Sequence, residues 1–300
     1  MTTLPATEAG NPRTEGLDAW TSLQALEAMW EGQLAAVAAV RPALPALAAA
    51  AEAAAVLLAG GGRLAYVGAG TSGRIGVQDG SELPPTFDWS PERLLLLVAG
   101  GRAALTEAIE GAEDRADAGA ADVAAHGVGP GDVVVGLAAS GGTPYTVAAV
   151  AEAARRGALT VGVANSAGSP LLRAAAHPIL VETGAEAVAG STRMGAGTAQ
   201  KAVLNLFSTL VMVRLGRVYR GRMVDVVARN AKLRRRAERM LGELTGCEAE
   251  AGQAALAAAD GKVKLAVLVL RGMTREGAER ALAAHGGDLR RTIAGTGIGE

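Results

Sequence analysis

Five short apolar runs alternate with helical patterns through the first two thirds of the chain, and this alternation constrains the fold more than any other feature. The runs are RLAYV, LLLLV, DVVVGLA, LTVGVA and HPILVE, at 63–67, 94–98, 132–138, 159–164 and 177–182. Gly, Asp or Pro bounds them, which is typical of strands buried on both faces. The sequence therefore predicts an α/β domain in which helices cover both faces of a mostly parallel sheet, giving three layers.

The helical patterns between the runs are clearest at 106–125 and 143–157. In the second pattern, Thr143 is expected to be the N-cap and Pro144 the first helical residue. Two further helices are predicted before the first run, at 21–40 and 43–59. A long helix is expected to follow the last run.

The remaining segments define the predicted domains. Residues 1–16 are polar and lack periodicity, so they are interpreted as an arm, and the chain changes to short helices near Leu244. These features predict three parts: an N-terminal arm with helices at 1–58, the α/β domain at 59–240, and a small helical domain at 241–300.

Composition excludes several classes of function. A net charge of −1 gives no basic field, so a nucleic-acid partner is not expected, and the basic run at 231–239 is interpreted as a solvated helix face. The single cysteine, Cys247, and the lack of a signal-sequence pattern predict a cytoplasmic protein without disulfides. The apolar stretch at 43–59 is interpreted as a buried helix rather than a membrane span. Three widely separated histidines predict no metal site.

Three loops combine glycine with Ser or Thr just before a helix. They are GAGTSG at 68–73, ASGGT at 139–143 and GSTRMGAGT at 190–198. Ligands of parallel sheets bind at the carboxyl ends of strands, and glycine, hydroxyls and helix N-terminal amides together suit an anion. The three loops predict a shared phosphate-type site.

The first loop also contains a GxGxxG pattern, at Gly68, Gly70 and Gly73. A dinucleotide site needs an acidic residue at the end of the second strand. The segment there, AGGRAAL at 99–105, has no carboxylate, so a monophosphate on a small sugar is favoured over a dinucleotide.

Carboxylates are the expected proton carriers near these loops. Glu82 precedes Pro84 and Pro85, which are expected to end a helix, although a surface glutamate capping a turn would look the same. The predicted helix at 106–125 carries four more carboxylates: Glu107, Glu110, Glu113 and Asp114. A solvated acidic helix face would give the same pattern. Basic groups beside the loops are Arg74, Arg193 and Lys201.

Five motifs, in this order, resemble the bacterial N-acetylmuramic acid 6-phosphate etherases: GAGTSGRIGVQDGSELPPT, EGAED, GLAASGGTPY, GSTRMGAGTAQKAVLN and MVDVVARN. These proteins belong to the sugar isomerase (SIS) superfamily and are related to glucokinase regulatory proteins. The resemblance extends from TEAGN near residue 7 to TGCEAEAGQAAL and AHGGDLR. It implies a SIS-type domain with a small C-terminal helical, UBA-like subdomain.

The resemblance also implies a function. Such enzymes use no cofactor to remove D-lactate from the C3 ether of N-acetylmuramic acid 6-phosphate, which leaves N-acetylglucosamine 6-phosphate. Glu82 would be the acid that assists lactate departure, and Glu113 the C2 base. The sugar-phosphate pocket would be lined by Thr71, Ser72, Ser140, Thr143, Ser191, Thr192 and Arg193. A homodimer with sites near the subunit interface is implied as well.

Two glycines depart from the family pattern. Gly142 stands where these proteins usually have Arg, and Gly195 where they usually have Lys. Both changes remove positive charge, so an etherase-like enzyme with an altered substrate is one alternative. A sugar-phosphate-binding regulator of a kinase or other partner is a second, and an aldose–ketose isomerase is a third.

Overall fold

The computed structural model describes residues 6–227 and 231–297, so the end of the MVDVVARN motif, at 228–230, lies outside the described residues. The chain divides into two compact units: Met1–Gly80 with Glu92–Thr209, and Ser81–Pro91 with Leu210–Glu300. The sequence-based boundary at 241 lies within the second unit.

A five-stranded parallel sheet forms the centre of the first unit, which confirms the predicted α/β class. Its order is β2-β1-β3-β4-β5, with bounds β1 (Leu64–Gly68), β2 (Leu94–Val98), β3 (Val133–Ala138), β4 (Leu159–Ala164) and β5 (His177–Leu180). All five apolar runs become strands. The inner strands β1, β3 and β4 are buried almost throughout, whereas the edge strands β2 and β5 are partly exposed, and Leu96 of β2 is 36% exposed. On β1, Ala65 and Val67 pack with Tyr145 and Ala149 of helix α5, whereas Tyr66 faces the opposite layer.

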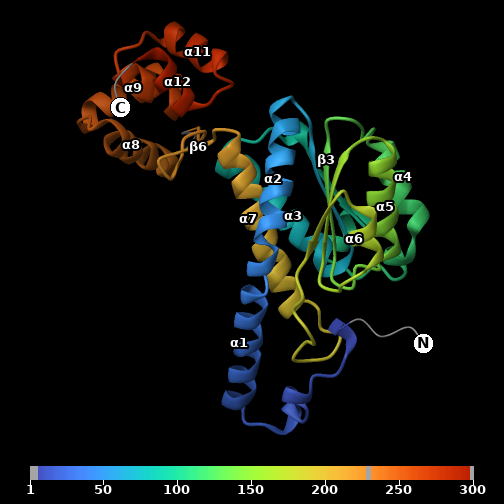
Figure 1. Ribbon diagram of the computed structural model, residues 1–300. Helices are drawn as coiled ribbons and strands as arrows, with labels where there is room; N and C mark the ends of the chain where they lie inside the picture. Colours follow the sequence, from blue (N-terminus) through green and yellow to red (C-terminus); the bar gives the residue numbers. More distant parts are fainter. Residues whose placement is uncertain (1–5, 228–230, 298–300) are drawn as a thin grey trace. The chain divides into compact units, whose positions relative to one another are not determined.

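Helices cover both faces of this sheet, with α4, α5 and α6 on one side and α2, α3 and α7 on the other (Figure 1). Their bounds, with that of α1, are α1 (Ser22–Ala38), α2 (Leu44–Ala59), α3 (Gly70–Phe87), α4 (Ala116–Ala125), α5 (Pro144–Arg155), α6 (Pro170–Ala174) and α7 (Gly195–Arg214). The predicted helices before the first strand and after the last one are thus confirmed. The N-terminal arm is folded into three 3-10 turns: η1 (Ala6–Glu8), η2 (Pro12–Thr14) and η3 (Leu17–Ala19).

One stretch of the described chain, Ser22–Ala59, is long enough to cross a membrane and contains an 18-residue window with a mean hydropathy of 1.7. Core helices and signal sequences pass the same test. The structure breaks this stretch into α1 and α2 at the turn η4 (Arg41–Ala43), where Pro42 removes a backbone donor. Six residues of α2 are buried, as the interpretation of 43–59 required: Leu47, Ala50, Ala51, Ala54, Ala55 and Leu58.

Two local predictions are wrong. Helix α3 continues through Pro84 and Pro85 to Phe87 instead of ending before them. The prolines lie in the last turns, where Asp88 N still donates to the carbonyl of Pro84 at 3.0 Å, so the cost of the missing donors is confined to the helix end.

The helix predicted at 106–125 begins only at Ala116. Gly111 adopts φ +68°, a left-handed conformation that interrupts a helix, and the short turn η7 (Ala112–Asp114) forms in this part of the predicted helix. Another short turn, η6 (Gly101–Leu105), precedes it. The acidic residues of this segment therefore do not share one helix face.

The second unit is mostly helical around its own core. Its elements are β6 (Val218–Tyr219), β7 (Arg222–Met223), α8 (Ala231–Thr245), α9 (Ala249–Ala258), α10 (Val263–Leu270), α11 (Arg275–Ala284) and α12 (Leu289–Thr296). Lys264 is buried in this unit, where its ammonium lies 2.8 Å from Asp225. Burial lowers the pKa of Lys264, and Asp225 opposes that shift. The UBA-like character of these helices stays a prediction.

Candidate functional site

The cavity that we take as the candidate site lies at the carboxyl ends of β1, β3 and β4 and has a volume of about 1010 Å³. In the observed order, the chain leaves β1 toward β2 on one side and β3 toward β4 on the other. The crevice between β1 and β3 is therefore the topological switch point, where open α/β sheets bind their ligands.

The glycines of the GxGxxG pattern bring α3 close to β1. A Cβ on Gly68 would lie 2.8 Å from Gly73 N, and a Cβ on Gly73 would lie 2.8 Å from Gly68 O. Gly70 adopts φ +51°. The pattern is explained by this close backbone approach and turn, so it requires no dinucleotide.

The first hydroxyl loop lines the cavity from the start of α3. Thr71 and Ser72 lie in the first turn of the helix, beside its free N-terminal amides, and both line the cavity. Uncharged donors and a helix N-terminus together form an anion site. The structure thus brings together the first two predicted binding residues.

The second loop, between β3 and α5, adds two more hydroxyls. Ser140 Oγ accepts a hydrogen bond of 3.2 Å from Gly142 N, which orders the loop. Thr143 occupies the N-cap position of α5, but its side chain makes no capping hydrogen bond. Its hydroxyl and the first amides of α5 are therefore available to a ligand in the cavity.

The start of α5 is held firmly against α4. Tyr145 donates a 2.6 Å hydrogen bond to Asp122, and a Cβ on Gly119 would lie only 2.1 Å from the carbonyl of Tyr145. Burial, and then the contact with Asp122, raises the pKa of Tyr145. These contacts fix the amide end of α5 at the cavity.

The third loop contributes less than the sequence predicted. Thr192 lines the cavity, whereas Ser191 and Arg193 are not among the lining residues. The N-terminus of α7 is already occupied, because Glu186 accepts hydrogen bonds from Gly195 N at 2.7 Å and Ala196 N at 2.9 Å. An anion would therefore meet a carboxylate at this helix end.

The loop after β4 was not among the predicted binding loops. Ser166 and Ser169 line the cavity, and the Oγ atom of each is buried without a hydrogen-bond partner. Asn165 anchors the loop by donating 2.9 Å to the carbonyl of Val181. The sequence of this loop, ANSAGSP, combines glycine with serine as the other three loops do, so the same composition could have predicted this loop as part of the site.

Four carboxylates line the cavity: Glu8, Glu113, Asp114 and Glu182. Glu113 and Asp114 come from η7, while Glu107 and Glu110 are not among the lining residues. No Lys, Arg or His lines the cavity among the residues that the structure describes. The site therefore combines uncharged donors for an anion with carboxylates that can move protons.

The three basic candidates lie outside the lining. Arg74 donates to the carbonyls of Ala104 and Glu107, at 3.0 and 3.1 Å, and so holds the η6 region. Lys201 donates 2.7 Å to Asn205 on its own helix. Arg193 is exposed.

Glu82 is also not among the lining residues. It is exposed in the second half of α3, twelve residues after Gly70. Glu82 belongs to the second compact unit, whereas every residue that lines the cavity belongs to the first.

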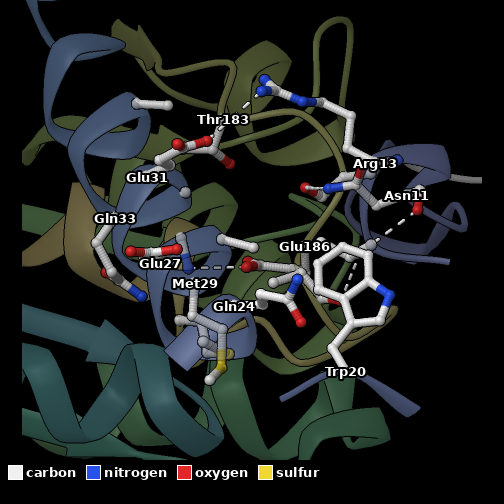
Figure 2. Close-up of a pocket in the computed structure, with 18 residues that line it drawn as sticks. Asn11, Arg13, Trp20, Gln24, Glu27, Met29, Glu31, Gln33, Thr183 and Glu186 are labelled. Carbon is white, nitrogen blue, oxygen red and sulfur yellow. Dashed lines mark hydrogen bonds and ion pairs between the residues drawn. The ribbon is translucent and has the colours of Figure 1, made fainter. Parts of the chain in front are cut away.

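A second cavity, of about 510 Å³, lies between the arm, α1 and the loop before α7. In Figure 2, Asn11 and Arg13 of the arm lie on one side and Glu27 and Glu31 of α1 on the other. Its main polar groups are already paired, because Arg13 and Glu31 form an ion pair at 3.5 Å and Glu186 caps α7. It has no free helix N-terminus, so we do not take it as the phosphate site.

No cluster of three or more His, Cys, Asp or Glu residues suited to a metal ion is found in the part of the chain that the structure describes.

Comparisons with known proteins agree with this architecture. A model of the glucokinase regulatory protein N-terminal SIS domain matches residues 47–154, and a model of the SIS domain matches 115–210. A phosphoheptose isomerase structure from Francisella tularensis matches with a TM-score of 0.50 at 22% identity, covering 65% of this chain and 100% of that one. That likeness concerns the fold alone, and the matches to the two family models confirm the predicted SIS-type domain.

Curated relatives extend over nearly the whole chain. An N-acetylmuramic acid 6-phosphate etherase from Deinococcus radiodurans is 48% identical over 294 residues, which are 98% of this chain and 96% of that protein. One from Streptomyces avermitilis is 47% identical over 289 residues, which are 96% and 93% of the two chains.

Proposed function

The chain belongs to the N-acetylmuramic acid 6-phosphate etherase family, and on that premise we propose that it cleaves the C3 lactyl ether of N-acetylmuramic acid 6-phosphate. The products are D-lactate and N-acetylglucosamine 6-phosphate, as cell-wall amino sugar recycling requires, and the proposed compartment is the cytoplasm. One observation carries the proposal: the hydroxyls suited to a phosphate and the carboxylate of Glu113 line one cavity.

The phosphate is bound by uncharged donors in this proposal. Thr71 and Ser72 supply hydroxyls with the N-terminus of α3, and Ser140 and Thr143 supply them with the N-terminus of α5. The positive ends of two helix dipoles favour a dianion there without a cationic side chain.

Glu113 is the proposed base. Opening of the sugar ring exposes an aldehyde at C1, which acidifies the C2 proton. Glu113 removes that proton, the electron pair forms a C2–C3 double bond, and the C3–O bond breaks. Lactate leaves with a proton from an acid; water then adds its hydroxyl to C3 and a proton returns to C2. One water is consumed for each ether cleaved, so this is lyase-type chemistry without a cofactor.

Glu82 is the proposed acid, supplied by a second subunit. Glu82 is exposed, belongs to the second compact unit and is not among the residues that line the cavity, all of which come from the first unit. In a homodimer with sites near the interface, the partner subunit's Glu82 would complete the carboxylate pair. Ser191 and Arg193 are proposed to reach the substrate only after their loop adjusts.

The experiment is an assay of D-lactate released from N-acetylmuramic acid 6-phosphate by the purified protein. Wild type is expected to release lactate and Glu113→Gln to lose turnover, by at least about 100-fold for a missing general base. Glu110→Gln is the matched control, since this exposed neighbour does not line the cavity and should retain activity. No release at high protein concentration would exclude the etherase.

A sugar-phosphate-binding regulator is the second candidate. The match of residues 47–154 to the glucokinase regulatory protein domain and the lack of a cation among the lining residues favour it. Saturable binding of N-acetylglucosamine 6-phosphate without any turnover of N-acetylmuramic acid 6-phosphate would support this alternative.

A further inference from the structure

The N-terminal arm is held along the loop that precedes α7. Gly190 N donates 3.1 Å to the carbonyl of Thr7, whose side chain is fully buried. Further along the arm, Thr14 Oγ1 donates 2.8 Å to the carbonyl of Ala187. The arm is therefore an ordered part of the first unit from Thr7 onward, although its sequence shows no helical or strand periodicity.

This arrangement delivers one carboxylate to the cavity. Glu8 follows the buried Thr7 and lines the cavity together with Glu182, Gly190 and Thr192. A Cβ on Gly190 would lie 3.0 Å from Glu8 Oε2, so the glycine leaves room for this carboxylate. Within the described chain, no hydrogen bond or ion pair occupies the oxygens of Glu8.

The cavity thus has two chemically different regions. Hydroxyls and helix amides at Thr71, Ser72, Ser140 and Thr143 donate hydrogen bonds, whereas the carboxylate of Glu8 only accepts them. A phosphate would be repelled by Glu8 and attracted by the donors. The hydroxyl and amide N–H groups of a sugar are donors, and they suit a carboxylate acceptor.

We propose that Glu8 is a substrate-contacting residue that accepts hydrogen bonds from the sugar portion of the bound sugar phosphate, so that the N-terminal arm forms part of the binding site. The inference rests on the proposed function, which supplies an amino sugar 6-phosphate as the ligand. It adds a specificity-determining residue at a position that the catalytic pair does not use.

Calorimetric binding of two probes, N-acetylglucosamine 6-phosphate and inorganic phosphate, tests this role. Glu8→Ala is expected to weaken binding of the sugar phosphate by roughly ten-fold or more, the value of a lost charge-assisted hydrogen bond. Inorganic phosphate should bind as well as to wild type or better, because only the sugar contact and a negative charge are removed. Glu15→Ala is the matched control, an exposed arm carboxylate that is not among the lining residues. Thermal unfolding checks that both variants fold.

The outcomes separate the two proposals. If wild type binds the sugar phosphate and Glu8→Ala binds it equally well, the role of Glu8 is overturned and the proposed function stands. Equal losses for both probes, or an equal loss in Glu15→Ala, would also overturn it, since they indicate a general effect of the arm. Failure of wild type to bind the sugar phosphate would overturn this inference, whereas the proposed function is decided separately by the release of D-lactate from N-acetylmuramic acid 6-phosphate.

Discussion

The hydroxyl of Tyr66 on β1 donates a 2.6 Å hydrogen bond to the carboxylate of Asp79 on α3. Both residues are buried, and Asp79 also accepts from Asn205 at 2.7 Å and from Ser208 at 3.3 Å, both on α7. This one carboxylate therefore joins the strand before the cavity to two helices, without any cation. Burial, and then the charge of Asp79, raises the pKa of Tyr66 well above its usual value.

We expect Tyr66→Phe to lower the free energy of unfolding by about 1–2 kcal/mol, because Asp79 keeps two other donors. Asp79→Ala should cost more, about 3 kcal/mol, since it removes the acceptor of two buried hydroxyls, Tyr66 and Ser208, and of the exposed Asn205 amide, and leaves a cavity. Urea denaturation measures both values. A larger loss in Tyr66→Phe than in Asp79→Ala would contradict the role of Asp79 as the centre of the network.

Gly141 and Gly142 are adjacent but should respond oppositely to substitution. Gly141 adopts φ +67°, and its added Cβ would lie 2.1 Å from Ser169 Oγ, so Gly141→Ala should destabilise the fold by about 1–3 kcal/mol. A Cβ on Gly142 would meet nothing closer than Ser140 Oγ at 3.8 Å. Gly142→Arg should therefore fold normally.

Gly142→Arg should also tighten inorganic phosphate binding by about ten-fold, because it adds a cation to a cavity lined only by uncharged and acidic groups. Calorimetry measures this change, with Gly142→Ala as the uncharged control. If arginine and alanine variants bind phosphate equally, the phosphate does not lie near this loop.

A homodimer that shares its site predicts complementation between Glu82→Gln and Glu113→Gln. Each variant alone should be inactive, but mixed and reassembled subunits form heterodimers with one intact site. Random mixing in equal amounts should restore about a quarter of wild-type activity, since half of the dimers are mixed and each has one intact site. If no activity returns although heterodimers form, the two glutamates act from the same chain.

The lowered pKa of Asp132 makes the free energy of unfolding depend on pH. Burial raises the pKa of its carboxyl, but hydrogen bonds from the Arg63 side chain, Arg63 N and Gly129 N outweigh burial, so the net pKa is lowered. A depressed pKa in the folded state stabilises the protein above the usual Asp pKa of about 3.9. That stabilisation is lost as the pH falls through the folded-state value.

Asp132→Asn should therefore be clearly less stable than wild type at pH 7, and the difference should narrow in strong acid. Urea denaturation at several pH values measures it. If the difference in free energy of unfolding between wild type and Asp132→Asn stays constant from pH 7 to pH 3, the charge of Asp132 does not contribute to stability.

The sheet was predictable because five apolar runs that alternate with helical patterns leave few alternatives, although the edge strands β2 and β5 prove to be only partly buried. The hydroxyl loops followed from their positions at the strand ends. The conformation of the acidic segment at 106–115 was not predictable, because the positive φ of Gly111 interrupts the helix that its sequence pattern indicates. The prediction that Pro84 ends its helix was wrong because Pro84 lies near the end of α3, where the missing backbone N–H donor of a proline costs few hydrogen bonds. Glu8 was missed because hydrogen bonds from a distant loop, and no local periodicity, order the arm.

Cleavage in water enriched in ¹⁸O shows whether the C3 ether is broken by elimination and hydration. Elimination followed by hydration puts the water oxygen on C3, so the label should appear in N-acetylglucosamine 6-phosphate while D-lactate keeps the unlabelled ether oxygen. Authentic N-acetylglucosamine 6-phosphate in the same water corrects for exchange at the C1 aldehyde. Label in lactate, or no product at all, would contradict elimination of lactate followed by hydration at C3.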